Sequence, residues 1–414
     1  MSVTDAARLV GLSVRQARRV CRSFEAIGSA GLAHGNARRP PSNRIADATR
    51  ALIVEQARTT YVGFNDHHLT EMLNAHHALG VSRASVQRIL RSAGLASPRK
   101  RRGRKHRMRR ERRGRAGELL LWDGSTHDWL EGRGPLMCLI GAIDDATGAL
   151  MPGAHFVPNE CAVGYLRVLL ATINAHGAPL AIYMDRHGIF RRTDDHWTHA
   201  EQLAGEQDLT QVGCAMRELG IEPIFALSPQ AKGRVERLWG TLQDRLVSEM
   251  RLANIATLEA ANTFIASYVV RFNGRFAQKA AQKDSAFRPL KKMNLAYAAE
   301  EICAFRIERK VRNDNTVQTE GCVIEIPAHP SRATFAGATV QLRQLLDGTW
   351  RVFAHDVRIA ELTKSAPSKS PPRNKKVVKI KPAKEPKKIK LTFKQTQQRL
   401  AKEQAQNRTE SLSY

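Results

Sequence analysis

Three carboxylates occupy positions where a fold could bring them together. Asp123 follows the apolar run 119–122, Asp185 follows the apolar run 180–184, and Glu236 lies near the start of a long helical segment. A carboxylate directly after an apolar run is costly unless a cation or another partner compensates it. Two divalent cations about 3.5–4 Å apart, held by oxygen ligands, commonly catalyse hydrolysis or transesterification of a DNA phosphodiester. We therefore predict that these residues bind two Mg²⁺ or Mn²⁺ ions, with Asp123 as the bridging ligand.

The segments around the carboxylates alternate between strand-like and helical patterns. Their order is β-β-β-α-β-α-β-α, which is typical of a ribonuclease H-like α/β domain, and we assign this catalytic core to residues 118–290. In such a sheet the three carboxylates converge at one edge. The predicted strands are 119–122, 136–143, 150–157, 180–184 and 223–227, and the predicted helices are 159–175, 212–219 and 233–250.

The charge of the chain is large and unevenly distributed. The net charge is +27 and the isoelectric point is about 10.4, which predicts a polyanionic partner. Residues 1–118 carry a net charge of +17, residues 119–303 carry −3 and residues 304–414 carry +13. A generally basic, ribosomal-type protein would explain the total but not this partition. A near-neutral enzyme domain between parts that bind double-stranded DNA explains both.

The N-terminal residues predict two all-α helix-turn-helix units, at 1–44 and 45–98. In the first, Thr4 and Ser13 are expected to cap two helices, and in the second Ser82 is expected to cap the last helix. Both final helices carry polar faces suited to base edges and phosphates, although an ordinary helical hairpin with a solvated basic face is the alternative. The predicted DNA contacts are Arg15, Arg18, Arg19 and Arg22 in the first unit, and Arg83, Gln87 and Arg88 in the second.

Four histidines in the second unit raise the question of a zinc site. No cysteine lies between Cys21 and Cys138, so a site with two Cys and two His ligands would lack its sulfur ligands. We therefore expect these side chains to be surface residues of a helix. The four are His67, His68, His76 and His77.

The remaining segments are linkers and a small β domain. Residues 99–117 form a basic linker, with 12 Lys or Arg between Arg99 and Arg115, and residues 304–363 predict a small β-barrel. Residues 364–414 predict a basic disordered tail. The six cysteines form no C-x-x-C pair, and neither a membrane span nor a signal peptide is evident. A cytoplasmic protein is expected.

Three motifs resemble the integrase-core (DDE) insertion-sequence transposases, most closely the ISNCY type. They are LLWDGSTH at 120–127, IYMDRHGIF at 182–190 and SPQAKGRVERLWGTLQ at 228–243, and the resemblance covers about residues 1–290. It implies an enzyme that binds terminal inverted repeats, cleaves to expose 3′-OH ends and joins them to target DNA. It also implies self-association in a synaptic complex, at the nucleoid of a bacterial cytoplasm.

Two features depart from that family's usual pattern. Asp185 and Glu236 are separated by 50 residues, and the excess over the usual spacing falls in 191–210. We interpret this polar stretch as an insertion at the rim of the active site, with a role in protein–protein contacts or in gating. The second departure is Arg186-His187, where Asn-Gly is more usual.

Other polar residues near Glu236 are candidates for holding the DNA strand. Lys232 and Arg234 lie at the start of the predicted helix, whose N-terminal amides also favour phosphate, and Gln243 shares a helix face with Glu236. Two alternatives remain for the whole chain. A domesticated DNA-binding protein without catalysis is disfavoured by the intact acidic triad. A ribonuclease H-like nuclease that cleaves without joining is disfavoured because the two predicted helix-turn-helix units ahead of the core favour a site-specific joining enzyme.

Overall fold

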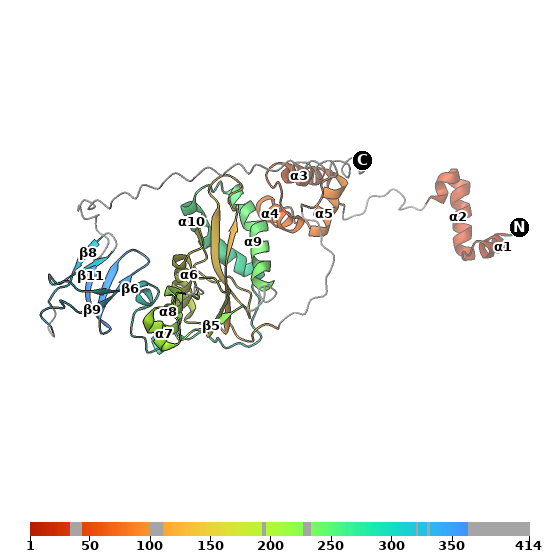
Figure 1. The fold of residues 1–414 in the computed structure, drawn as a ribbon. Helices are drawn as coiled ribbons and strands as arrows, with labels where there is room; N and C mark the ends of the chain where they lie inside the picture. The colour runs from red at the N-terminus through yellow and green to blue at the C-terminus, as the bar shows by residue number, and fades with distance from the viewer. Residues whose placement is uncertain are drawn as a thin grey trace, which may run out of the picture. The chain divides into compact units, whose positions relative to one another are not determined.

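The computed structural model describes seven stretches of the chain (Figure 1). Lys232, residues 99–110 of the predicted linker and the predicted tail 364–414 lie outside the described residues. Among the helices that are described, none is long and apolar enough to cross a membrane. The described stretches are 1–33, 44–98, 111–192, 196–226, 233–319, 322–328 and 332–362.

The first stretch contains the two predicted helices, α1 (Val3–Leu9) and α2 (Val14–Ile27), followed by a short 3₁₀ turn. The Ser13 hydroxyl accepts a hydrogen bond from the Gln16 amide at 3.2 Å, so the predicted cap of α2 is confirmed. The predicted cap of α1 is wrong, because Ser2 accepts from the Asp5 amide and Thr4 lies inside the helix. All four arginines of α2 singled out above are exposed.

The second unit consists of α3 (Asp47–Arg58), α4 (Asp66–His77) and α5 (Arg83–Ser92) around a small apolar core. Ser82 caps α5 as predicted, since its hydroxyl accepts from the Ser85 amide at 3.2 Å. The candidate DNA contacts of α5, Arg83, Gln87 and Arg88, are all exposed. The helices therefore leave a polar face open, and its use as a helix-turn-helix stays a prediction.

Helix α4 packs on the long helix α9 (Gly233–Leu252) through charged side chains. The Arg245 guanidinium donates to both carboxylate oxygens of Glu71, at 2.7 and 2.8 Å. His68 is fully buried, with Nε2 lying 3.2 Å from Glu249 Oε1, so the prediction that it is a surface residue is wrong. The spacing of apolar residues near His68 could not reveal this burial, because the side chain lies against α9, a helix more than 150 residues further along the chain.

The core is a five-stranded sheet of order β3-β2-β1-β4-β5, which fits a ribonuclease H-like α/β domain. The first three strands are antiparallel, and β4 and β5 run parallel to β1. The predicted order of elements is confirmed, with two additional helices, α7 (His199–Ala204) within 191–210 and α10 (Leu258–Phe276) after α9. The strands are β1 (Leu119–His127), β2 (Met137–Asp144), β3 (His155–Val157), β4 (Ala181–Met184) and β5 (Glu222–Phe225).

Strand β1 is longer than predicted. The apolar run ends at Trp122, but the polar residues beyond it stay in register with β2, from Asp123 opposite Gly141 to His127 opposite Met137. Asp123 therefore lies in the middle of a strand and not at its end. Backbone pairing in an antiparallel hairpin needs no apolar side chains, which is why the apolar run alone underestimates the strand.

Alternate residues of the sheet pack against different helices. Leu119 and Leu121 point to the layer formed by α9 and α10 (Leu258–Phe276), whereas Leu120 and Trp122 point to α6 (Ala162–His176) and α8 (Gln211–Glu218). Figure 1 shows α9 and α6 on opposite sides of the sheet. By this alternation Asp123 belongs to the α9 face.

The described residues between 305 and 362 form two separate sheets around an apolar core of their own. One sheet has four antiparallel strands in the order β11-β10-β9-β6, and the other is the hairpin β7-β8. The predicted small barrel is not confirmed. A short helix, α11 (Ala299–Ile302), precedes these strands. They are β6 (Phe305–Lys310), β7 (Thr316–Thr319), β8 (Cys322–Glu325), β9 (Thr339–Gln344), β10 (Trp350–Ala354) and β11 (Val357–Leu362).

Candidate active site

The two aspartates lie side by side at the junction of β1 and β4. These strands pair in parallel, with Leu119 opposite Ala181 and Leu121 opposite Tyr183. The same offset of 62 residues places Asp123 opposite Asp185, which directly follows β4. Neighbouring strands lie about 4.8 Å apart, so the two carboxylates are within reach of a shared ligand. Asp185 is half-buried, and its Oδ1 accepts from the His187 amide at 3.0 Å.

Helix α9 lies alongside strand β1 and contacts it at two successive helical turns. The indole Nε1 of Trp239 donates to Asp123 Oδ2 at 3.0 Å, and the amide of Gln243 donates to Ser125 Oγ at 3.2 Å. Trp239 is also a core residue, as its apolar ring leads one to expect, but sequence reasoning missed its contact with the carboxylate. Its position three residues after Glu236, one turn along a helix, is the signal that could have found it.

Glu236 lies in the first turn of α9, one turn before the tryptophan that contacts Asp123. Its side chain is exposed. In the part of the chain that the structure describes, no three His, Cys, Asp or Glu side chains are grouped closely enough to hold one metal ion. The fold thus brings Asp123 and Asp185 together and places Glu236 on the helix beside them, without closing a three-carboxylate cluster.

Two of the residues predicted to hold DNA have partners within the protein. Arg234 donates to the buried carboxylate of Asp145, in the turn after β2, and Gln243 bonds to Ser125 as described above. Lys232 lies outside the described residues. The roles of these three residues toward DNA stay predictions.

A further carboxylate, Glu160, approaches the site from the opposite face of the sheet. A Cβ atom on Gly124, the neighbour of Asp123, would lie only 2.9 Å from the Glu160 carboxyl carbon, so glycine is what lets this side chain approach. The Tyr165 hydroxyl donates to Glu160. Burial, and then the nearby Glu160 charge, raise the pKa of Tyr165 far above its usual range. Sequence reasoning did not single out Glu160, because it follows no apolar strand.

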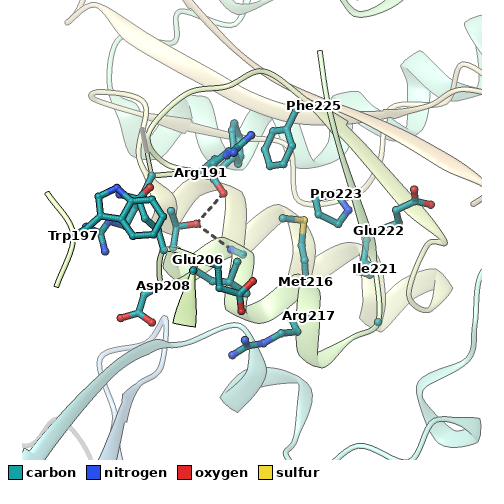
Figure 2. Close-up of a pocket in the computed structure, with 18 residues that line it drawn as sticks. Arg191, Trp197, Glu206, Asp208, Met216, Arg217, Ile221, Glu222, Pro223 and Phe225 are labelled. Atoms are coloured by element: carbon teal, nitrogen blue, oxygen red, sulfur yellow. Dashed lines mark hydrogen bonds between the residues drawn. The ribbon is translucent and has the colours of Figure 1, made fainter. Parts of the chain in front are cut away.

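The segment 191–210 borders a cavity of about 690 Å³. Figure 2 shows Trp197, Glu206 and Asp208 at this cavity, with Met216 and Phe225 from α8 and β5. None of the three candidate carboxylates lines it.

Within the same segment, Glu201 is almost completely buried rather than exposed at a rim. It accepts from the amides of Thr198 and Asp208 and pairs with Arg192. Those two amide hydrogen bonds lower the pKa of Glu201 to about 2. At least one of the acids in this polar stretch therefore serves to hold its fold, and the predicted gating or protein–protein role stays a prediction.

Two solved structures that the chain resembles have low TM-scores. The catalytic core domain of HTLV-2 integrase in complex with magnesium has a TM-score of 0.27 at 15% identity, covering 41% of this chain and 95% of that one. The simian T-cell lymphotropic virus intasome bound to the B56 gamma subunit of PP2A has a TM-score of 0.29 at 14% identity, covering 76% and 100%.

Comparison of sequences is more informative. No protein-family profile matches the chain. A Sinorhizobium fredii protein named as a transposase, y4bF, is 36% identical over 373 residues, which cover 87% of this chain and 79% of that protein. The transposase for insertion sequence IS1202 of Streptococcus pneumoniae is 31% identical over 307 residues, covering 65% and 64%. With this extent of identity added to the sheet order and to the motifs around Asp123, Asp185 and Glu236, the chain belongs to the integrase-core family of insertion-sequence transposases.

Proposed function

We propose that this transposase binds the terminal inverted repeats of its element, cleaves there to expose 3′-OH ends and joins those ends to target DNA. The observation that carries the proposal is the register of β1 and β4, which puts Asp123 opposite Asp185 beside the helix that bears Glu236. Cleavage breaks a phosphodiester by attack of water, and joining breaks a second one by attack of the new 3′-OH. Both reactions can use the same set of carboxylates.

The donor chemistry fits hard divalent cations. Asp123, Asp185 and Glu236 offer only oxygen ligands, which Mg²⁺ and Mn²⁺ prefer. When bound, two such ions would stabilise the charge that develops on the attacking and leaving oxygens. In our proposal Asp123 would be the ligand shared by both ions, Asp185 would hold one of them and Glu236 the other. The exposed Glu236 side chain would complete the set by turning toward the aspartates when DNA and cations bind, while the backbone of α9 stays in place.

The chain's own groups prepare the site for this role. Trp239, a buried side chain, holds one oxygen of Asp123 through a hydrogen bond from its indole N–H. The His187 amide donates a hydrogen bond to the Asp185 carboxylate, directly after the end of β4, and so orients it. Both aspartates are therefore positioned before any ligand arrives, which lowers the cost of organising the site.

Removal of divalent cations should abolish both reactions. Labelled duplexes that carry the element's terminal repeat are incubated with the full chain, and nicked and joined products are separated on denaturing gels. Excess chelator should eliminate both products, and added Mg²⁺ or Mn²⁺ should restore them. Nicking without joining would favour the nuclease alternative, and binding without either product at any cation concentration would favour a DNA-binding protein without catalysis.

Specific recognition is expected from α2. Its arginines Arg15, Arg18, Arg19 and Arg22 are exposed on one helix, and a base-reading arginine lost to alanine costs about 1–3 kcal/mol. The full chain with all four changed to alanine should lose its preference for terminal-repeat over random duplex in a competition assay. Substitution of Arg83, Gln87 and Arg88 on α5 is the matched comparison for the second unit. An unchanged preference in the α2 variant would contradict a reading role for that helix.

Further parts of the proposal concern partners and place. Synapsis of two element ends requires more than one active site, so we propose that the protein self-associates on DNA. Action on chromosomal DNA would place it in the bacterial cytoplasm, at the nucleoid.

A further inference from the structure

Asp145 is a carboxylate with a 0% exposed side chain in the turn that follows β2. Its Oδ2 accepts from the Arg113 amide at 2.8 Å, and its Oδ1 accepts from the guanidinium of Arg234. The Arg234 side chain is itself only 15% exposed. A buried ion pair of this kind is strongly destabilised when one partner is removed, because the other charge then lacks compensation.

The same turn is connected to the start of β1 and to the end of the basic linker. The Asp145 amide donates to the Leu119 carbonyl at 3.0 Å, and the Arg112 guanidinium donates to the Asp145 carbonyl at 2.9 Å. Burial, and then the positive charge of Arg234, lower the pKa of Arg112. Residues from the linker, from the β1–β2 hairpin and from α9 therefore meet at Asp145.

Helix α9 is thus held to the turn after β2 and to strand β1 at two points that flank Glu236. Arg234 contacts Asp145 two residues before Glu236, and Trp239 contacts Asp123 three residues after it. We propose that Arg234 and Asp145 are positioning residues, which fix the first turn of α9 so that Glu236 faces Asp123 and Asp185. This inference rests on the proposed function, and it gives Arg234 a role other than holding the DNA strand.

The pair matters because the first turn of a helix is its weakest part. The first four amides have no partner within the helix, and terminal turns open at little cost in free energy. A catalytic group displaced by about 1 Å can lose about 100-fold in rate. Loss of the Arg234–Asp145 contact should therefore reduce catalysis without removing any group that touches DNA or cation.

The test compares Arg234→Gln, Asp145→Asn and the double variant with the unmodified full chain. Single-turnover cleavage of terminal-repeat duplex is measured at saturating DNA, together with the DNA dissociation constant and the Mg²⁺ concentration that gives half-maximal rate. We expect each single variant to cleave about 10- to 100-fold more slowly and to need more Mg²⁺, at unchanged DNA affinity. The double variant should be no slower than either single one, because both changes remove the same contact.

Two results would overturn the inference. If Arg234→Gln weakens DNA binding while Asp145→Asn does not, Arg234 serves DNA directly. If the double variant shows the product of two independent defects, the two residues do not act as a pair. Arg234→Lys keeps the charge that compensates Asp145 but not the planar fork, so we expect it to recover part of the rate that Arg234→Gln loses.

A control and a second readout separate this inference from the proposed function. Glu201→Gln removes another buried acid paired with an arginine, away from α9, and should leave the Mg²⁺ requirement unchanged. Hydrogen exchange of the amides of Arg237 to Trp239, the first with partners inside α9, needs no catalysis, and it should be faster in Asp145→Asn than in Glu201→Gln. If even the unmodified chain does not cleave and exchange still rises as expected, the proposed function fails and the positioning contact stands. Unchanged exchange in Asp145→Asn would remove the positioning role.

Discussion

Asp123→Asn should abolish strand cleavage and joining while leaving DNA binding intact. An amide is nearly the same shape as a carboxylate, and its oxygen can still accept the hydrogen bond from Trp239. It has no negative charge with which to bridge two cations, so about 4 kcal/mol or more of transition-state stabilisation should be lost, or at least about 1000-fold in rate. The measurement is single-turnover cleavage of a labelled terminal-repeat duplex in Mg²⁺, beside a gel-shift titration.

Asp128→Asn is the matched control for this prediction. Asp128 lies five residues further along, is exposed, and accepts from the Gly132 amide at 3.0 Å. The Asp128→Asn variant loses one negative charge from the same segment, as Asp123→Asn does, and should cleave DNA at close to the rate of the unmodified protein. Wild-type cleavage by Asp123→Asn would show that the catalytic carboxylates lie elsewhere.

Glu71→Leu should destabilise the packing of α4 on α9 by about 3–5 kcal/mol. The Arg245 side chain is only 7% exposed, and Glu71 satisfies it with two hydrogen bonds. Without that acid a nearly buried guanidinium keeps its charge and loses its main partner. Urea-induced unfolding followed by circular dichroism measures the loss in the free energy of unfolding.

Two further variants make this result specific. Arg275 also pairs with Glu71, but its side chain is 41% exposed, so Arg275→Ala should cost no more than about 1 kcal/mol. Changing both buried partners, as Glu71→Leu with Arg245→Met, should recover most of the stability because no isolated charge remains. Equal costs for Glu71→Leu and Arg275→Ala would contradict the importance of the buried pair.

Much of the catalytic core could be predicted from the sequence because its signals are local. Strands β2 and β4 and the first part of β1 are largely apolar runs, and each candidate aspartate directly follows such a run. Apolar residues at helical spacing also predicted α6 and α9 close to their observed bounds. The order of these elements is enough to indicate the sheet, and hence the neighbourhood of Asp123 and Asp185.

What could not be predicted depends on contacts between distant segments. Arg234 and Asp145 are 89 residues apart, and nothing near either one reveals the pairing. The same holds for His68, whose buried ring lies against Glu249 of α9. The cap of α1 failed for a different reason, since Ser2 and Thr4 are both suitable capping residues and the choice between them is a matter of small local energies.

The length of α9 has a consequence for how this chain can change over evolutionary time. One uninterrupted helix of 20 residues, about 30 Å long, carries Glu236 at one end and Arg245 and Glu249 further along. Each added residue rotates everything after it by about 100°, so a single insertion between Glu236 and Arg245 would turn either the carboxylate away from the sheet or the arginine away from Glu71. Point substitutions on the exposed face carry no such penalty. The number of residues between these two positions is therefore far more constrained than their surroundings, and loops on either side of the helix are where the chain can gain or lose length.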